Sequence, residues 1–341
     1  MALLAAALRA ELGRYATLPW AGRVPAVSLF FGGGTPSLLP PDLIGSLIVA
    51  ARRQLGLDAD AEVTLEANPE GLDRGALAAF RQAGVTRFSL GVQALDDHLL
   101  RRLGRKHSAR EARAAFAAAR AAGFDNIGID LLYGAPGQSL ADWAATVDEV
   151  IAWRPEHLSA YALTLEPGTP FGRRAPADLP DEEVQVAQFE RLEEQAAAAG
   201  LERYEISNFA RPGFRSRHNL LYWRREEYIG LGPGAHGALG RVRTANLRSQ
   251  TRYAAAVRAG AWPIERWERL TDDQIDGERL VLGLRLADGV PRAWVETRLD
   301  GRRPRALADY VAADLLQVRG DRVALTSRGV LVSDAIFAEL V

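Results

Sequence analysis

Three glycines stand where a short apolar segment of the chain ends. The last two, Gly33 and Gly34, follow the run AVSLFF at residues 26–31 and precede Thr35. Glycine lets the backbone approach a ligand closely and turn its N–H groups toward an anionic or zwitterionic group. A tight turn between a strand and a helix explains the same residues. The run matches neither GxGxxG nor the P-loop pattern, which excludes the usual nucleotide-binding loops.

Four polar residues form a second set of candidate site residues. Glu66, Gln93 and Asp130 lie at or near the ends of successive apolar runs, and Arg105 follows a short helical pattern. A carboxylate inside an otherwise apolar strand is costly to bury unless it is paired. These residues therefore predict either a polar ring around a bound ligand or mutual hydrogen bonds that close the end of a barrel.

Aromatic and polar residues are mixed between residues 204 and 237. This stretch contains YEISNF, RHN, YW and GPGAHG, with little helical periodicity. It suits a site for a large flat ligand with acidic substituents, and it suits equally a lid that packs on a barrel. The five histidines of the chain show no HExxH or comparable spacing, so no metal site is predicted.

The 341 residues include no cysteine. The chain alone therefore supplies no disulfide, thiolate nucleophile, zinc–cysteine site or cysteine-ligated iron–sulfur cluster. Lys and Arg number 42 and Asp and Glu number 43, which gives a net charge of -1. With this balance no global field attracts nucleic acid or an anionic membrane, and we expect no nucleic-acid partner.

Alternating strands and helices must position these residues. The predicted strands cover residues 26–31, 62–67, 87–93, 126–133, 157–165 and 202–206. The predicted helices between them cover residues 42–55, 73–83, 96–103, 109–122, 140–153 and 181–199. Because parallel strands need long crossovers, this alternation predicts an α/β fold with a parallel sheet, as a partial or full barrel. Function in such folds sits in the loops after the strand C-termini.

The composition and the periodicity of the sequence change twice along the chain. Residues 1–210 carry the barrel core, residues 211–269 form an irregular extension rich in Arg and aromatic residues, and residues 270–341 form a C-terminal helical module. The elements predicted for this module are helices at 272–284, 305–316 and 327–340 and a strand at 322–325. Short helices with a β-ribbon are compatible with a winged-helix module.

The opening residues form an amphipathic helix rather than a signal peptide. Leu4, Leu8 and Leu12 recur at helical spacing, and charged residues such as Arg9 and Glu11 interrupt the apolar pattern. No stretch of the chain approaches the roughly 18 apolar residues that a membrane helix needs. The expected location is the cytoplasm.

Eight motifs occur together and in order, namely FFGGGTPSLL, TLEANPE, RFSLGVQALDDHLLRRLGRKH, NIGIDLLYGAPGQ, HLSAYALTLEPGTPF, YEISNFA, RHNLLYW and GPGAHG. On these motifs the chain resembles the oxygen-independent coproporphyrinogen III oxidase family of radical S-adenosylmethionine (SAM) proteins. Within that family it resembles most the HemW-type haem chaperone branch. The resemblance covers nearly the whole chain, including the C-terminal module, and implies a radical-SAM-type barrel.

This resemblance implies that SAM binds at the strand ends. It places Gly33, Gly34 and Thr35 along the methionine end of SAM. It also implies SAM contacts from six further residues, which are Glu66, Gln93, Arg105, Asp130, Thr164 and His236. The residue types agree, because glycine-rich backbone suits an amino-acid moiety and carboxylates suit an amino group and ribose hydroxyls.

The sequence departs from the family at its start. The family opens with a strand and a CxxxCxxC loop whose cysteines bind a 4Fe–4S cluster, and this chain has neither. We therefore expect a partial (β/α)6 barrel without its first strand and with an open edge beside residues 26–31. The expected cause is N-terminal truncation through a misplaced start codon, and the alternative is a degenerate paralogue that keeps a haem- or SAM-binding role. The reading frame upstream of Met1 decides between them.

The resemblance implies a haem chaperone that binds haem and passes it to an acceptor protein. The alternative is an oxidase-type radical SAM enzyme of porphyrin biosynthesis, which uses a SAM-derived radical to decarboxylate propionates. Radical chemistry is not expected from this chain as written, because it holds no cluster ligands. With no cysteine and Met1 as the only methionine, axial ligation of haem falls to His or Tyr, and His218 and His236 are the candidates.

Overall fold

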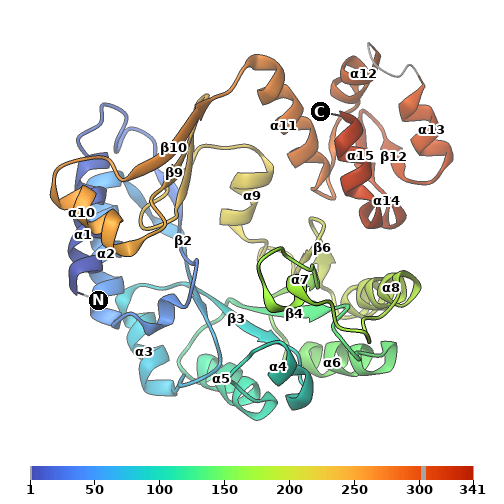
Figure 1. Cartoon of the computed structure of the whole chain (residues 1–341), viewed down its shortest axis with the longest axis horizontal. Helices are drawn as coiled ribbons and strands as arrows, with labels where there is room; N and C mark the ends of the chain where they lie inside the picture. The colour runs from blue at the N-terminus through green and yellow to red at the C-terminus, as the bar shows by residue number, and fades with distance from the viewer. Residues whose placement is uncertain (1, 301–304, 341) are drawn as a thin grey trace. The chain divides into compact units, whose positions relative to one another are not determined.

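A computed structural model describes residues 2–300 and 305–340 of the chain. The chain forms two compact units (Figure 1). The first unit consists of Met1–Gly33, Leu39–Val63 and Ser216–Val341. The second unit consists of Gly34–Leu38 and Thr64–Arg215.

A seven-stranded sheet organises the described residues, in the order β1-β2-β3-β4-β5-β7-β6. Its strands are β1 (Ala26–Phe31), β2 (Leu57–Ala67), β3 (Arg87–Gln93), β4 (Ile127–Tyr133), β5 (His157–Ala162), β6 (Glu202–Arg203) and β7 (Asn208–Ala210). The pairs β2–β3, β3–β4 and β4–β5 are parallel, as the alternation of strands and helices predicts. β1 stands at one end of this order, where the sequence predicts an open edge.

Helices connect the strands, and all but the short α7 lie within a residue or two of the predicted bounds. They are α2 (Pro41–Leu55), α3 (Arg74–Ala83), α4 (Asp97–Arg102), α5 (Ala109–Ala121), α6 (Leu140–Ala152), α7 (Pro170–Arg173) and α8 (Glu182–Ala198), with a 3-10 turn at Pro36–Leu38. Side chains at the helix starts satisfy free backbone N–H groups. Ser108 and Ser139 do so in capping boxes with Glu111 and Asp142. No helix of the described residues is both long and apolar enough to cross a membrane.

The two faces of the parallel strands differ in polarity. One face carries fully buried apolar side chains, such as Leu65, Phe88 and Ile129. Figure 1 shows α3, α5 and α6 along the outer side of β3 and β4. Since side chains alternate along a strand, the residues between these apolar ones lie on the opposite face, and many of them are polar. This second face contains the candidate site.

The last strands of the sheet differ from the predicted pattern. The sequence predicts one strand over residues 202–206, but β6 stops at Arg203 and β7 begins only at Asn208. Between them, Glu205 accepts hydrogen bonds from the Ser207 backbone N–H at 3.2 Å and from the Asn208 side-chain amide. This local bonding turns the chain, and β7 pairs antiparallel with β5. The predicted strand is therefore wrong beyond residue 203.

The first unit contains more regular structure than the sequence predicts for residues 211–269. Its elements there are α9 (Arg217–Trp223), β8 (His236–Leu239), β9 (Val242–Asn246), α10 (Gln250–Arg258) and β10 (Ile264–Arg269). The three strands form an antiparallel sheet in the order β10-β9-β8. The opening helix α1 (Ala2–Tyr15) is present as predicted and packs against α10 and α2.

The C-terminal module combines short helices with a small antiparallel sheet of order β11-β13-β12. Its elements are α11 (Asp272–Leu284), β11 (Val290–Pro291), α12 (Arg292–Asp300), α13 (Ala306–Ala312), β12 (Leu316–Arg319), β13 (Arg322–Leu325), α14 (Ser327–Leu331) and α15 (Ser333–Leu340). The helix predicted at 305–316 is wrong in its last residues. Asp314 takes a left-handed conformation with φ 57°, which ends the helix, and the chain continues into β12. The helix predicted at 327–340 is broken into two at Val332.

Candidate functional site

Polar residues of neighbouring strands share one face of the sheet in the second unit. The strand register places Glu66 of β2 beside Ser89 of β3. It places Gly91 of β3 beside Asp130 of β4, and Asp130 beside Ser159 of β5. Register partners of parallel strands share a face, so these residues lie on a common surface. The structure thus brings the predicted residues Glu66 and Asp130 onto one face near the strand ends.

Asp130 is a desolvated carboxyl group on this face. Ser89 Oγ lies 3.4 Å and 3.3 Å from the two carboxylate oxygens, and Ser159 donates a further hydrogen bond. Desolvation raises the pKa of Asp130, while these hydrogen bonds and the positive charges of Arg87 and Arg105 act to lower it. A desolvated carboxylate is a strong acceptor for hydroxyl or ammonium groups of a ligand.

Gln93 ends β3 in a conformation that side chains rarely adopt. Its φ is 67°, and the N–H of Ala94 donates to the carbonyl of Val92 at 2.8 Å, so Gln93 is the central residue of a tight γ-turn. A Cβ at Gly91 would lie 3.0 Å from Gln93 Nε2 and 3.3 Å from Asn68 Oδ1. Glycine at 91 therefore leaves room for both amide side chains. Strain of this kind costs on the order of 1–3 kcal/mol and is typical of functional sites.

His107 fastens the loop that carries Arg105. This imidazole is buried, its Nε2 donates to the Val92 carbonyl at 3.0 Å, and its Nδ1 faces Glu70 Oε2 at 3.5 Å. Burial lowers the pKa of Arg105, whereas the charges of Glu70 and Asp130 raise it. The charges of Asp130 and Arg105 act on each other, so the loop brings these two predicted residues near one another.

The glycine loop offers open backbone. Gly33 and Gly34 have φ of 81° and 153°, and no heavy atom lies within 4 Å of the position that a Cβ would take at either residue. Thr35 follows, and its hydroxyl accepts a hydrogen bond of 3.1 Å from the amide of Asn68. Asn68 thus links the loop to the end of β2. Open glycine backbone beside polar side chains suits the amino-acid end of a ligand.

Two of the residues that the resemblance implies take part in none of the contacts described above. Thr164 is exposed in the loop that follows β5. His236 is exposed at the start of β8, in the first unit. Their roles stay predictions. The residues that sequence reasoning missed are Asn68, Arg87, Ser89, His107 and Ser159, and most of them follow a signal in the sequence, since polar residues alternate with apolar ones along β2, β3 and β5.

His218 of the first unit has both ring nitrogens engaged. Nδ1 lies 3.1 Å from Ser28 Oγ and Nε2 lies 2.9 Å from Tyr222 Oη. The ring stacks on Phe30 at a centroid distance of 4.6 Å. The start of its helix is held by Glu62, which accepts from the His218 backbone N–H at 3.1 Å. These contacts join α9 to β1 and β2, and they give His218 a structural role.

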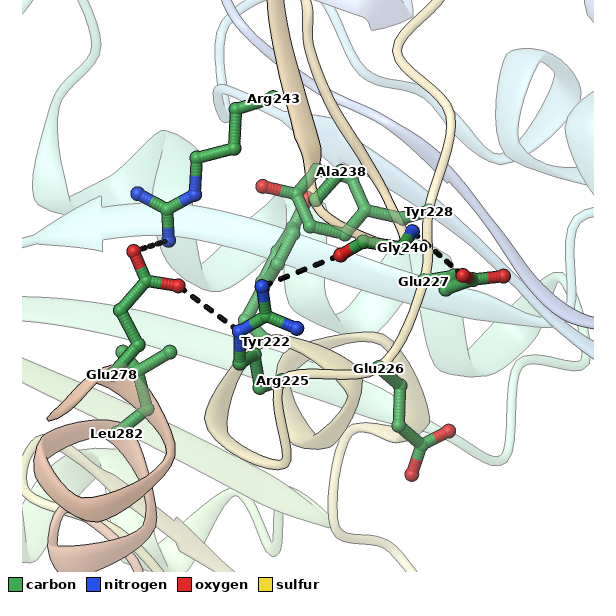
Figure 2. A pocket seen from close by; sticks show the side chains of 10 residues that line it. All are labelled: Tyr222, Arg225, Glu226, Glu227, Tyr228, Ala238, Gly240, Arg243, Glu278 and Leu282. Carbon is green, nitrogen blue, oxygen red and sulfur yellow. Dashed lines mark hydrogen bonds and ion pairs between the residues drawn. The ribbon is translucent and has the colours of Figure 1, made fainter. Parts of the chain in front are cut away.

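A pocket of about 130 Å³ opens beside α9, β8, β9 and α11 in the first unit (Figure 2). Glu278 lies between two arginines at its wall, 3.0 Å from Arg225 Nε and 2.8 Å from Arg243 Nη2. Arg225 also donates to the Gly240 carbonyl at 3.3 Å. Because Glu278 already neutralises the arginines, this arrangement joins α11 to its neighbours rather than offering a free anion site.

Family comparisons define the class of protein to which this fold and these strand ends belong. The model of the Radical SAM superfamily matches residues 19–150, and that of the HemN C-terminal domain matches residues 270–332. The solved structure titled "Coproporphyrinogen III oxidase (HemN) from Escherichia coli is a Radical SAM enzyme" superimposes with a TM-score of 0.84 at 24% identity. It covers 99% of this chain and 82% of that one. The chain therefore has the radical-SAM partial-barrel fold with a HemN-type C-terminal module, as the sequence predicts.

Curated relatives specify the family further. The chain is 40% identical to "Heme chaperone HemW" of Mycobacterium tuberculosis (strain CDC 1551 / Oshkosh) over 98% of its own length and 85% of the relative. It is 34% identical to "Heme chaperone HemW" of Bacillus subtilis (strain 168) over 94% of its length and 87% of that relative. The chain belongs to the HemW family.

The residues present fit one of the two cofactors that the Radical SAM family implies. The open glycine backbone, the strained Gln93 and the desolvated Asp130 form a set suited to the zwitterionic end and the hydroxyl groups of SAM. A 4Fe–4S cluster needs thiolates, and the 341 residues contain no cysteine, so they do not fit a cysteine-ligated cluster. Among the described residues, no group of three His, Asp or Glu side chains is placed to hold a metal ion.

Proposed function

We infer that this chain is a haem chaperone, which binds haem and passes it to an acceptor protein, on a barrel whose strand ends bind SAM. The observation that carries this function is the 40% identity to a heme chaperone HemW over 98% of the chain. The three regions predicted from the sequence support three separate roles. Residues 1–210 hold the SAM site, residues 211–269 contribute to the haem site, and residues 270–341 form the HemN-type module.

The iron of haem needs an axial ligand, which in this chain is a histidine or tyrosine. His107 and His157 are buried, and both nitrogens of His218 are engaged. The two exposed histidines are His98 and His236. His236 lies in the Gly-rich, aromatic-flanked segment that suits a large flat ligand, and this position favours it as the haem ligand.

A titration with haem, followed by the Soret band, tests this assignment. We expect His236→Ala to weaken haem binding by about tenfold or more and to change the Soret maximum, because an axial ligand is lost. His98→Ala is the matched control, since it removes the other exposed imidazole, and it should titrate like the unmodified chain. Identical titrations of all three proteins exclude His236 as the ligand.

SAM, when bound, supplies a reactive sulfonium group beside the sheet. The chain's own part is to bind and orient it. Backbone N–H groups at Gly33 and Gly34 accommodate its carboxylate, and Glu66 and Asp130 accept from its ammonium and hydroxyl groups. Gln93 adds an amide from the strained end of β3. The resemblance supports contacts from Thr35, Arg105 and Thr164 as well. It also implies a SAM contact from His236, which is the alternative to the haem role proposed for that residue.

Calorimetry with SAM tests the site directly. Asp130→Asn removes the charge of a desolvated acceptor, so we expect the dissociation constant to rise by about tenfold or more. The control is Asp125→Asn, which changes an exposed aspartate just before β4 and should leave the affinity within about twofold. Equal affinities of the two variants contradict a SAM site at Asp130.

A further inference from the structure

Glu11 of α1 is a buried carboxyl group that accepts three hydrogen bonds. It is 0% exposed. Its Oε2 accepts from the Gly232 backbone N–H at 2.8 Å and from the Tyr253 hydroxyl at 2.6 Å. Its Oε1 accepts from the Asn246 side-chain amide at 2.7 Å. Since Gly232 belongs to the glycine-rich segment that leads into His236, this carboxyl group contacts the loop before β8.

Residues 230–236 form a closed loop in front of β8. A Cβ on Gly230 would overlap the backbone of His236, so the two ends of the loop lie against each other. Gly232 and Gly234 hold φ of 109° and 70°, a left-handed backbone that favours glycine. The last residue of this loop is the exposed His236.

Asn246 of β9 links this loop to Glu11. It is 3% exposed, and its side-chain nitrogen donates both to Glu11 and, at 3.1 Å, to the Gly232 carbonyl. Its backbone N–H donates to the Ala235 carbonyl at 2.8 Å. Glu11 and Asn246 together therefore hold the N–H and the carbonyl of Gly232, and Asn246 also holds the residue directly before His236.

Both oxygen atoms of Glu11 must accept a hydrogen bond. The Gly232 N–H at Oε2 and the Asn246 side-chain nitrogen at Oε1 can only donate. A glutamine at position 11 would place its NH₂ group against one of these two donors. Turning the Asn246 amide to compensate would remove its bond to the Gly232 carbonyl. An amide of the same size therefore disrupts the contacts that hold the loop.

We propose that Glu11 is a positioning residue for His236, because it fixes the 230–236 loop in the shape that presents this imidazole to haem. The anchoring of the loop by Glu11 does not depend on the function of the chain. The role toward haem rests on the proposed function, in which His236 is the axial ligand.

Amide hydrogen exchange in the ligand-free chain tests the anchoring. In Glu11→Gln we expect the Gly232 N–H to exchange about tenfold or more faster, because its bond to the carboxyl group is weakened or lost. The Tyr253 N–H, which donates to the Ser249 carbonyl at 2.8 Å in α10, is the internal reference and should change by less than about threefold. Equal acceleration at both amides, or unchanged exchange at Gly232, overturns the anchoring.

Glu62→Gln is the matched control variant. Glu62 is also a buried glutamate of the first unit, and it accepts from the backbone N–H groups of Arg217 and His218 at 3.0 Å and 3.1 Å. These bonds hold α9 rather than the 230–236 loop. Glu62→Gln should therefore lose stability and leave the exchange of the Gly232 N–H unchanged. Faster exchange at Gly232 in both variants means that Glu11 has no specific role in the loop. Far-ultraviolet circular dichroism establishes that each variant is folded.

Titration with haem, followed by the Soret band, tests the positioning role. We expect Glu11→Gln to raise the dissociation constant about fivefold to tenfold, while Glu62→Gln binds like the unmodified chain. Asn246→Ala is the second variant, because it keeps Glu11 but removes the bond to the Gly232 carbonyl, and it should weaken haem binding as well. In a His236→Ala background, neither change should have a further effect, because the residue that the loop positions is gone.

Two results of this titration overturn the positioning role. One is haem binding that stays unchanged in both Glu11→Gln and Asn246→Ala. The other is equal weakening with and without His236, which a merely structural residue would produce. If His236→Ala itself binds haem like the unmodified chain, His236 is not the ligand and the positioning role fails with that part of the proposed function. The exchange of the Gly232 N–H then still decides whether Glu11 anchors the loop.

Discussion

Single residues at the ends of the central strands carry conformations and charges that packing alone does not require. Gln93 keeps φ at 67° although a glycine would hold that backbone without strain. Asp130 keeps a desolvated carboxyl group beside two serine hydroxyls. Such costs persist where a ligand uses the groups involved.

Replacing Gln93 separates strain from function. In Gln93→Gly we expect the free energy of unfolding to rise by up to about 1 kcal/mol, because left-handed backbone suits glycine. SAM affinity should fall, because the amide is lost. The control is Arg154→Gly, which relieves the same kind of conformation, φ 60°, at an exposed residue before β5 and should leave SAM affinity unchanged. Unchanged SAM affinity in Gln93→Gly contradicts a ligand contact at this residue.

At the scale of single residues, the sequence predicts the two site carboxylates, but it does not predict the buried residues Arg87 and His107 beside them. Glu66 and Asp130 are visible because a charge inside an apolar run is unusual. Arg87 begins its strand and looks like an ordinary exposed end, yet it is 2% exposed, because the strands on both sides bury it. His107 is equally hidden, since its bond to the Val92 carbonyl joins residues that only the folded loop brings together.

Among the elements, α1 is joined to the rest of the first unit by a buried carboxyl group in addition to its packing against α10 and α2. Glu11 accepts hydrogen bonds from the Gly232 N–H at 2.8 Å, the Asn246 amide at 2.7 Å and the Tyr253 hydroxyl at 2.6 Å. Burial raises the pKa of Glu11 above its ordinary value of 4.5, although these bonds and Arg14 act to lower it. The helix is thus joined at its middle to three separate segments.

This raised pKa predicts a pH dependence of stability. The folded chain holds the Glu11 proton more tightly than the unfolded chain, so this contribution is full below pH 4.5 and is lost as pH rises through the folded-state pKa. Thermal unfolding of the unmodified chain should therefore lose stability over this range relative to Glu11→Gln. The control is Glu149→Gln, because the pKa of Glu149 is lowered, first by its hydrogen bond with Arg113. The contribution of Glu149 to stability therefore depends on pH in the opposite sense, because it is lost as pH falls through the folded-state pKa. Parallel pH profiles of the unmodified chain and Glu11→Gln contradict the raised pKa.

The helix α9 depends in a similar way on His218. His218→Ala removes two side-chain hydrogen bonds and a stacked ring, and we expect a loss of about 2 kcal/mol in the free energy of unfolding. His98→Ala, at an exposed position, should change stability by less than about 0.5 kcal/mol. Chemical denaturation measures both. Equal midpoints of the two variants contradict the structural role of His218.

Periodic elements are predictable from this sequence, and turns made by side chains are not. The helices between the first strands follow from runs of apolar residues and from capping residues such as Ser108 and Ser139. The first five strands follow as well, although β2 begins at Leu57 rather than residue 62 and β5 ends at Ala162 rather than residue 165. The reversal before β7 depends on Glu205 bonding to Ser207 and Asn208, which no periodic pattern records. Likewise, Asp314 ends α13 through a single left-handed residue.

The whole molecule joins a radical-SAM partial barrel to a HemN-type C-terminal module, in a chain of the HemW family without cysteine. Its residues fit SAM and supply no thiolate to a cluster. The proposed haem binding and transfer rest on the family, and the proposed strand-end site rests on the geometry. A carrier of this kind binds its cargo in a fixed ratio and releases it unchanged.

Equilibrium titration of the full chain with haem, with the recovered haem analysed by mass spectrometry, tests this claim most directly. A haem chaperone should saturate at one haem per chain and return the haem chemically intact, both with and without SAM. Absence of saturable binding, or a recovered porphyrin that has lost carboxyl groups, would contradict the account.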